Sequence, residues 1–276
     1  ALLVKGWIEA KSMNRLKDNV AIVTGAGRVG NIGVAVCDAF LREGARAVIG
    51  TDIRTDEAAA IICDLESKHG AGRFRLLPHD TTRQDDWEQV INVAVKDCGG
   101  LDVLVNNAGI SVHGGVESTS IEEMHHVMAV NHDALFLGMK LALPALSESH
   151  KRFPGGGSVI NTLSMASYMP SANNLSYQVS KAAGRMLTLC AAVEFGKKRI
   201  RVNSVHPGLT ITPLVKEAFQ EYADRGLWES YQAAENAIAA MAPLGIPSQP
   251  EDTAHAFVYL ASDESAFVTG TSIVID

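Results

Sequence analysis

Short runs of apolar residues, many of them β-branched, alternate along the chain with longer stretches in which apolar residues recur at helical spacing. The short runs predict seven strands, over 20–24, 47–51, 74–78, 101–106, 158–163, 200–205 and 272–275. The longer stretches predict helices over 31–43, 55–69, 84–98, 120–149, 175–198 and 250–262. Because the strand runs are apolar at consecutive positions, helices are expected on both faces of the sheet. The pattern predicts an α/β fold with a single-domain, doubly wound (Rossmann), seven-stranded parallel sheet.

One segment, 209–250, breaks this alternation because it carries helical patterns and no strand pattern. An insertion of this length in a compact domain is usually functional, so we predict a helical substrate lid. The alternative is a helical excursion whose aromatic side chains pack on the domain. Its apolar residues are Leu214, Phe219, Tyr222, Leu227, Trp228, Tyr231 and Met241. Residues 1–13 precede the first well-patterned stretch and are predicted to be an N-terminal extension of the domain at 14–276.

Composition narrows the classes of partner. Hydrophobic residues make up 47% of the chain, which is too apolar for a disordered protein. A net charge of −7 argues against nucleic acid or an anionic membrane surface as a partner, because both require a basic face. The cysteines form no metal-binding spacing, and no apolar run reaches about 18 residues. These features predict reduced thiols, no transmembrane helix and a cytoplasmic protein.

A glycine-rich turn follows the first predicted strand, with the sequence Gly25-Ala26-Gly27-Arg28-Val29-Gly30-Asn31-Ile32-Gly33. Such a turn lets backbone amides approach a pyrophosphate at the start of a helix. Asp52 ends the second strand, where an acidic residue accepts hydrogen bonds from the ribose of NAD and repels the 2′-phosphate of NADP. Arg28 and Arg54 are the residues that could pair with such a phosphate, or they are solvated surface residues. The acid favours NAD over NADP.

A second group of residues has the spacing of a catalytic site. Tyr177 and Lys181 lie at positions i and i+4 of a predicted helix and therefore share one face. Ser164 follows the fifth strand, the run Asn106-Asn107-Ala108-Gly109 ends the fourth, and Asn131 lies within the long helix predicted over 120–149.

Taken in order, these motifs make the chain similar to the short-chain dehydrogenase/reductase family, from about Asn14 to Asp276. The motifs that carry the resemblance are the turn at 24–33, Asp52, Asp80, Asn106-Asn107-Ala108-Gly109, Asn131, Ser164, Tyr177 with Lys181, and Pro207-Gly208. The resemblance implies that Ser164, Tyr177 and Lys181 are catalytic and that Asn131 completes a tetrad. With the turn and the strand ends, it predicts a cofactor site formed by Gly25, Arg28, Gly30, Asn31, Ile32, Asp52, Ile53, Asp80, Thr81, Asn107, Ala108, Gly109, Tyr177, Lys181, Pro207, Gly208, Thr210 and Thr212.

The residue types suit hydride transfer between an alcohol and a nicotinamide. A proton must leave or join the substrate oxygen, which requires a general acid/base. A free tyrosine has a pKa of ~10, and we expect the ammonium of Lys181 and the positive nicotinamide ring to lower the pKa of Tyr177. Ser164 is expected to hold the substrate oxygen.

The chain departs from the family pattern in two places. The third glycine of the turn arrives one residue late, at Gly33, and threonines follow Pro207-Gly208 where an aliphatic residue is usual. Thr212 still occupies the family position whose hydroxyl approaches the nicotinamide amide.

The resemblance implies an oxidoreductase acting on a hydrophobic secondary alcohol or its ketone with NAD(H). Candidate substrate residues are His113, Met165, Met169, Leu214 and Trp228. Two alternatives remain: a 3-oxoacyl-thioester reductase of fatty-acid type, or a non-catalytic NAD-binding regulator on the same fold. The histidines form no metal-binding motif, so no metal is expected. Apolar residues on the helices at 120–149 and 175–198, with the family resemblance, imply a homotetramer or a homodimer.

Overall fold

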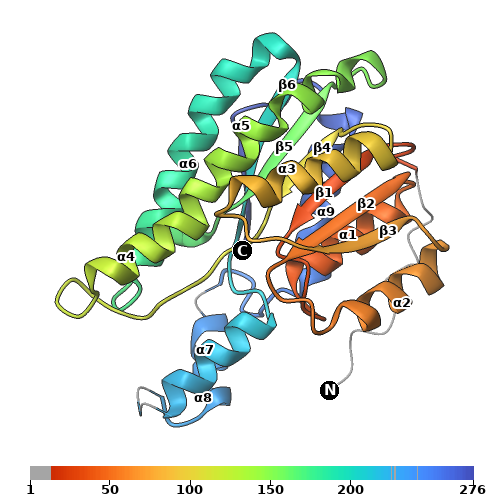
Figure 1. Ribbon diagram of the computed structural model, residues 1–276. Helices are drawn as coiled ribbons and strands as arrows, with labels where there is room; N and C mark the ends of the chain where they lie inside the picture. The colour runs from red at the N-terminus through yellow and green to blue at the C-terminus, as the bar shows by residue number, and fades with distance from the viewer. Residues whose placement is uncertain (1–13, 225, 227, 241) are drawn as a thin grey trace.

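The computed structural model describes residues 14–224, 226, 228–240 and 242–276. The predicted extension at 1–13 and the lid candidates Leu227 and Met241 lie outside the described residues, as does the side chain of Tyr222. The described chain folds around one central sheet with helices against both of its faces (Figure 1). Among the described helices, none is both long enough and apolar enough to cross a bilayer.

All seven predicted strands are present, and every pair of neighbours is parallel. The sheet order is β3-β2-β1-β4-β5-β6-β7, which confirms the doubly wound fold. The strands are β1 (Val20–Thr24), β2 (Ala47–Asp52), β3 (Phe74–Pro78), β4 (Val103–Asn106), β5 (Gly157–Thr162), β6 (Ile200–Pro207) and β7 (Ser272–Ile275). The order reverses between β1 and β4, where doubly wound sheets open a crevice at the carboxyl ends of their strands.

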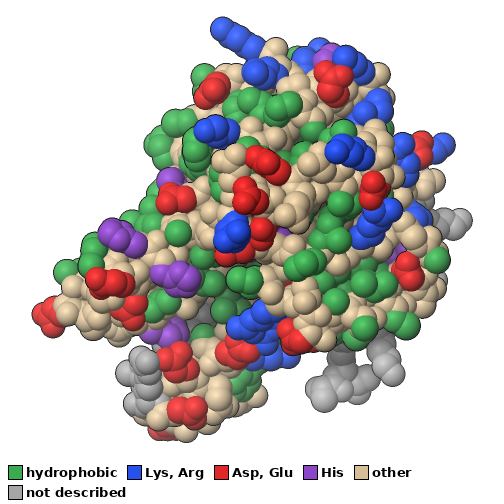
Figure 2. Space-filling model, in the orientation of Figure 1, with side chains coloured by type: hydrophobic (Ala, Val, Ile, Leu, Met, Phe, Trp, Pro, Cys, Tyr) green, Lys and Arg blue, Asp and Glu red, His purple; other side chains and the backbone are tan. Residues whose placement is uncertain are grey.

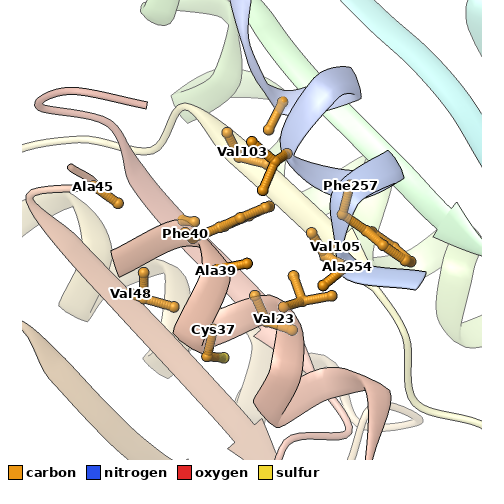
Figure 3. Close-up of a cluster of buried hydrophobic side chains, with 14 of the residues drawn as sticks. Val23, Cys37, Ala39, Phe40, Ala45, Val48, Val103, Val105, Ala254 and Phe257 are labelled. Atoms are coloured by element: carbon orange, nitrogen blue, oxygen red, sulfur yellow. The ribbon is translucent and has the colours of Figure 1, made fainter. Parts of the chain in front are cut away.

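One face of the sheet is covered by α1 (Ile32–Arg42), α2 (Ala58–His69) and α9 (Pro250–Ala261). Figure 3 shows Phe40 of α1 and Phe257 of α9 packed over the sheet residues Val23 and Val105. Full burial of such side chains contributes about 1.5–3 kcal/mol each. This layer holds the carboxyl end of β1 against the start of α1.

The opposite face is covered by α3 (Gln84–Asn92), α5 (Ala134–Ser147) and α6 (Leu175–Phe195). Trp87 of α3 is completely buried, and its indole N–H donates to the carbonyl of Thr81 at 2.8 Å. Because α6 packs directly on the sheet, the face that carries Tyr177 and Lys181 is held beside the ends of β5 and β6.

The helix predicted over 120–149 is present, but it is not a regular α-helix throughout. The structure divides it into α4 (Ile121–Met128), a π-helical turn (Ala129–Asp133) and α5. A second π-helical turn (Val93–Asp97) ends the helix predicted over 84–98. The extra residue of a π turn changes which side chains face inward, and such turns often occur at functional sites. The π turn at Ala129–Asp133 carries Asn131, which is completely buried.

The segment at 209–250 forms two helices, α7 (Pro213–Asp224) and α8 (Tyr231–Ala239). Phe219 of α7 is buried against the ring of Tyr231 of α8, with the ring centroids 6.0 Å apart. The two helices form a lobe that projects from the body of the molecule, which we call the α7–α8 lobe (Figure 1). Helical structure here is confirmed, and its role as a substrate lid stays a prediction.

Candidate active site

A cavity of about 440 Å³ opens at the carboxyl ends of the strands and extends beneath the start of α7. The described residues that line it come from every strand end between β1 and β6, together with α4, α6 and α7. They are Gly25, Arg28, Asn31, Ile32, Asp52, Ile53, Arg54, His79, Asp80, Thr81, Asn107, Ala108, Gly109, Ile110, His126, Val130, Thr162, Leu163, Ser164, Tyr177, Lys181, Pro207, Gly208, Thr210, Thr212, Pro213, Leu214, Val215 and Glu217. Figure 2 shows acidic and basic side chains side by side where the α7–α8 lobe meets the body.

The glycine-rich turn is a cradle that side chains would fill. Gly25 has a φ of +70°, and a Cβ there would come within 2.8 Å of the Cα of Ala108. A Cβ on Gly33 would lie 2.2 Å from the carbonyl oxygen of Gly25. The late third glycine therefore lets the first turn of α1 pack against the end of β1. This close approach exposes the start of a helix to the cavity, which suits a pyrophosphate.

Side chains next to the turn fix its backbone. Asn31 caps α1, because its Oδ1 accepts the amide of Val34 at 2.8 Å while its Nδ2 donates to the carbonyl of Gly25 at 2.9 Å. The hydroxyl oxygen of Thr24 accepts the amides of Asn107 and Ala108, at 2.9 and 3.0 Å. The ends of β1 and β4 are thereby tied together beneath the cavity.

Asp52 stands at the end of β2 with both carboxylate oxygens engaged by backbone. Oδ2 accepts the amide of Gly27 at 2.8 Å, and Oδ1 accepts the amide of Arg54 at 2.9 Å. A side chain on Gly27 would meet the carbonyl oxygen of Arg54 at 2.1 Å, so only glycine fits against this acid. The carboxylate is held at the cavity wall, in the position expected for binding a ribose.

The loop after β3 forms another part of the wall. Burial acts to raise the pKa of Asp80, but hydrogen bonds from Thr82 and the charge of Arg83 outweigh it, and the pKa is lowered. His79, which sequence reasoning did not select, is buried with its Nδ1 2.9 Å from the hydroxyl of Thr51, and burial lowers its pKa to about 4. Its ring packs edge-on against Trp87, with the centroids 4.5 Å apart. Asp80 is therefore an anion beside a neutral imidazole at neutral pH.

The structure brings Ser164, Tyr177 and Lys181 to one wall of the cavity. The Lys181 ammonium donates to the carbonyl of Thr162 at 3.0 Å and lies 5.5 Å from the centroid of the Tyr177 ring. Burial lowers the pKa of Lys181 to about 8. The hydroxyl oxygen of Ser164 accepts the amide of Ala166 at 3.1 Å. A serine hydroxyl, a phenol and an amine therefore meet where a substrate oxygen could be held.

The pKa of Tyr177 moves in the direction opposite to the sequence expectation. Burial raises it, because a phenolate loses hydration in the protein interior, while a hydrogen bond with Ser164 acts to lower it. The expected lowering included the charge of a bound, oxidised nicotinamide ring. The protein alone therefore stabilises the neutral phenol.

Asn131 lies behind this wall and does not line the cavity. Its side chain pairs with the backbone of Ile110 twice, accepting the amide at 2.9 Å and donating to the carbonyl at 2.8 Å. It also donates to the hydroxyl of Ser180, at 3.0 Å, which in turn donates to the carbonyl of Tyr177. Asn131 thus connects the segment that follows β4 to α6, the helix that carries Tyr177.

The predicted cofactor residues converge on the cavity with one exception. Gly30 does not line it, although its φ of +77° is part of the turn. Their arrangement fits a dinucleotide, with the glycine cradle for the pyrophosphate and Asp52 for a ribose. The turn after β6 closes the other end. There the Thr210 hydroxyl lies 2.8 Å from that of Ser248, and Thr212 Oγ1 accepts the amide of Val215 at the start of α7.

The substrate candidates converge less well. Leu214 lines the cavity, whereas the structure does not place His113, Met165, Met169 or Trp228 among the described lining residues. Met169 follows the helical turn Met165–Ser167, and its side chain is 57% exposed. Trp228 is 38% exposed, and His113 lies 3.6 Å from Glu221 of α7.

Sequence reasoning also missed several lining residues, because their positions depend on how distant elements fold together. The apolar ones, beside the catalytic wall or on α7, are Ile110, Val130, Leu163, Pro213 and Val215. The polar ones are His79, His126, Thr162 and Glu217. Arg54, which the sequence suggested as a possible partner of a 2′-phosphate, also lines the cavity. His126 and Glu217 lie on helices whose orientation no local pattern reveals.

Comparisons with known proteins agree with this geometry. A family model described as "Enoyl-(Acyl carrier protein) reductase" matches residues 25–276. The chain is 35% identical to a 2,5-dichloro-2,5-cyclohexadiene-1,4-diol dehydrogenase of Sphingobium indicum over 263 residues, 95% of this chain and 96% of that protein. It is also 35% identical to an NADP-dependent (R)-specific alcohol dehydrogenase of Lentilactobacillus kefiri over 268 residues, 95% of this chain and 97% of that protein.

A solved structure is similar as well. A short-chain type dehydrogenase/reductase from Mycobacterium marinum superposes with a TM-score of 0.82 at 30% identity, over 96% of each chain. The order of the strands, the convergence of the motifs at one cavity and these similarities lead to one conclusion. The chain belongs to the short-chain dehydrogenase/reductase family of oxidoreductases.

Proposed function

We propose that the protein transfers hydride between a hydrophobic secondary alcohol, or its ketone, and NAD(H), with Tyr177 as the general acid/base. The observation that carries this proposal is the meeting of Ser164, Tyr177 and Lys181 at one wall of the cavity whose other end holds the glycine cradle and Asp52. A non-catalytic nucleotide-binding protein would need the cradle but not the acid/base group. The catalytic wall therefore favours an enzyme.

Each residue of the wall has a distinct task. The Ser164 hydroxyl donates a hydrogen bond to the substrate oxygen, while its own oxygen accepts the amide of Ala166. The hydroxyl oxygen of Tyr177 takes the proton from the alcohol during oxidation and returns it during reduction. The nicotinamide, when bound, accepts or supplies the hydride. While it carries its proton, the Lys181 ammonium, 5.5 Å from the centroid of the Tyr177 ring, stabilises a phenolate formed there.

Two features of the adenosine end of the cavity support NAD. Asp52 is fixed at the wall by two backbone amides and would repel a 2′-phosphate. Arg28, one of two arginines near it, is paired with Glu217, at 2.5 Å. The L. kefiri relative uses NADP, so the preference requires a direct test.

The substrate class follows from the side chains near Ser164. Apolar residues dominate this end of the cavity, with Ile110, Val130, Leu163, Leu214 and Val215. The arginines among the described lining residues flank Asp52 at the other end, so Ser164 has no guanidinium beside it to bind a carboxylate. A neutral alcohol on an apolar ring fits this wall, and the S. indicum relative is named for a cyclic diol.

The test is a screen that varies the substrate and the cofactor together. Cyclic secondary alcohols, short 2-hydroxy acids and a 3-hydroxyacyl thioester are offered with NAD and with NADP, and reduced cofactor is followed by absorbance. We expect the highest kcat/KM for a cyclic alcohol with NAD. A higher kcat/KM for the hydroxy acid would overturn the substrate class, and turnover of the thioester with NADP would support the fatty-acid-type reductase instead.

The proposal includes an assembly and a location. Phe136 of α5 and Val179, Met186 and Val193 of α6 are exposed apolar residues on helices that the family pairs between subunits. Leu135 and Met139 of α5 are buried within the chain and do not belong to this surface. We expect a homotetramer or homodimer by sedimentation velocity. The four cysteines are free, which suits the reducing cytoplasm.

A further inference from the structure

His206 lies where the hydrogen-bonded pairing of β5 with β6 ends. The last ladder bond runs from the amide of Leu163 to the carbonyl of Val205, at 2.8 Å. At the next residue, the carbonyl of Ser164 lies 3.1 Å from Nδ1 of the His206 ring. A side chain thus continues the ladder by one bond, at the residue that carries the proposed catalytic hydroxyl. His206 is completely buried, so water does not compete for this bond.

The surroundings of His206 assign its protonation. A carbonyl can only accept, so Nδ1 carries the hydrogen. Nε2 lies 2.9 Å from the Ser204 hydroxyl, which also lies 3.3 Å from the carbonyl of Thr271 and 3.2 Å from the hydroxyl of Ser272. In a neutral ring with its hydrogen on Nδ1, Nε2 accepts the shorter of these contacts. Burial is the main cause that lowers the pKa of His206; the charges of Arg185 and Lys181 act in the same direction, and the bond to Ser164 opposes them. The ring is therefore neutral, with a fixed tautomer.

The segment from Ser164 to Tyr168, which we call the catalytic loop, also contacts the His206 ring at its other end. Tyr168, at the end of the helical turn Met165–Ser167, packs against His206 with the ring centroids 4.9 Å apart. The guanidinium of Arg185 lies over the Tyr168 ring, with its Cζ 4.6 Å from the ring centroid. The catalytic loop is therefore held by its first residue through a hydrogen bond and by its last through a tilted ring contact.

Within this loop the Ser164 hydroxyl has little freedom. The carbonyl of Ser164 accepts the amide of Ser167 at 2.9 Å, and the Oγ of Ser164 accepts the amide of Ala166 at 3.1 Å. Rotation of the peptide plane after Ser164 would move both bonds. The bond from His206 opposes that rotation, because it fixes the direction of the Ser164 carbonyl.

We infer that His206 is a positioning residue for Ser164: its Nδ1–H fixes the Ser164 backbone so that the hydroxyl faces the substrate oxygen. This inference rests on the proposed function, in which Ser164 holds that oxygen. His206 does not line the cavity, so its effect passes through the serine. A misplacement of about 1 Å at a reacting group can cost as much as ~100-fold in rate.

The test uses substitutions that separate the two ring nitrogens. His206→Leu removes both polar contacts at similar volume. His206→Asn retains a donor at the position of Nδ1, and His206→Gln retains one at the position of Nε2. Ser204→Ala, a matched control, removes the partner of Nε2 and leaves the bond to Ser164 intact. Steady-state kcat and KM with a cyclic alcohol, the Kd for NAD and thermal unfolding are measured for each variant.

We expect His206→Leu and His206→Gln to lower kcat by ~10- to 100-fold with the Kd for NAD unchanged, whereas His206→Asn and Ser204→Ala stay near wild type. Equal loss of kcat in the Asn and Gln variants would show a merely structural role and overturn the inference, as would a wild-type kcat in the Leu variant. If the Leu variant does not fold, the Asn and Gln pair carries the test.

Ser164→Ala separates this inference from the proposed function. If Ser164→Ala keeps full turnover, the proposed function fails, and the role of His206 fails with it. If Ser164→Ala loses turnover while the His206 variants keep theirs, the function stands and only the positioning role is overturned.

Discussion

The guanidinium of Arg28 forms a bidentate ion pair with the carboxylate of Glu217, with N–O distances of 2.5 and 3.1 Å. Arg28 belongs to the glycine-rich turn and Glu217 to α7. The pair therefore joins two segments that are far apart in the sequence and that both line the cavity. The hydrogen bond to Glu217 is the main cause that raises the pKa of Arg28, and the same bond lowers the pKa of Glu217. The α7–α8 lobe is thereby linked to the part of the chain that would hold the pyrophosphate.

Glu217→Gln is expected to weaken this link. Both side chains reach solvent, and exposed ion pairs contribute about 0–1 kcal/mol, so we expect the KM for NAD to rise by no more than ~5-fold. The freed Arg28 should at the same time raise the ratio of NADP to NAD turnover. The control is Asp97→Asn, which removes a similarly exposed pair with Arg75 elsewhere on the surface. Equal cofactor kinetics in both variants would show that the Arg28–Glu217 pair does not act on nucleotide binding.

Tyr177→Phe removes the proposed acid/base group and little else. General acid–base catalysis contributes typically ~10²–10⁴-fold, so we expect kcat to fall by at least that range. NAD binding, followed by quenching of protein fluorescence, should stay unchanged because the ring remains in place. A Phe variant that keeps more than about a tenth of the wild-type kcat would exclude Tyr177 as the acid/base.

The same group fixes the direction of the pH dependence. Alcohol oxidation requires the phenolate, and ketone reduction requires the phenol. Burial holds the pKa of Tyr177 above its ordinary value in the protein alone. The rate of oxidation should therefore rise with pH into the alkaline range, while the rate of reduction falls there. Parallel pH profiles in the two directions would contradict this assignment.

The strands and the cofactor turn could be predicted from the sequence because their signals are local. Each strand contains a short apolar run, and the glycines, Asp52 and the pair Tyr177 and Lys181 lie at fixed spacings from strand ends. A doubly wound parallel sheet then brings the carboxyl ends of all its strands to one edge, independently of the loop conformations. The fold and the position of the cavity follow from these two facts.

The rest of the site depends on contacts that no local pattern encodes. The π turn at Asn131 follows from how the helix passes the backbone of Ile110. The pairing of Arg28 with Glu217 and the contact of His206 with Ser164 join residues from different elements. Of the predicted substrate residues, Leu214 lines the cavity and Met169 and Trp228 do not, since apolar side chains suit a cavity wall and a partly exposed surface equally.

Lys181 is expected to cost stability at neutral pH. Burial lowers its pKa from 10.5 to about 8, so between these values the unfolded chain holds a proton that the folded chain has released. Stability contributed by this group therefore rises with pH across that window, by about 3 kcal/mol in total. In denaturant unfolding, the free energy of unfolding of wild type should increase relative to that of Lys181→Met from pH 8 to 10. A difference that does not vary with pH would contradict the burial of a charged amine.

Gly33→Ala tests whether the late glycine is required by packing. The added Cβ would lie 2.2 Å from the carbonyl oxygen of Gly25 and 3.0 Å from Nδ2 of Asn107, both of which are held by other hydrogen bonds. Overpacking of this kind costs about 1–3 kcal/mol, and the displaced turn should also weaken NAD binding.

Two other glycines provide the controls. Gly30→Ala adds a Cβ with no atom within 4 Å but at a φ of +77°, so only backbone strain of about 1 kcal/mol is expected. Gly196→Ala meets no atom within 4 Å and has a helical φ of −53°, so stability should be unchanged or slightly higher. Stability is measured by denaturant unfolding and affinity by NAD titration. Because the clash is specific to Gly33, a Gly33→Ala variant that binds NAD as well as Gly196→Ala would show that the start of α1 need not approach β1 so closely.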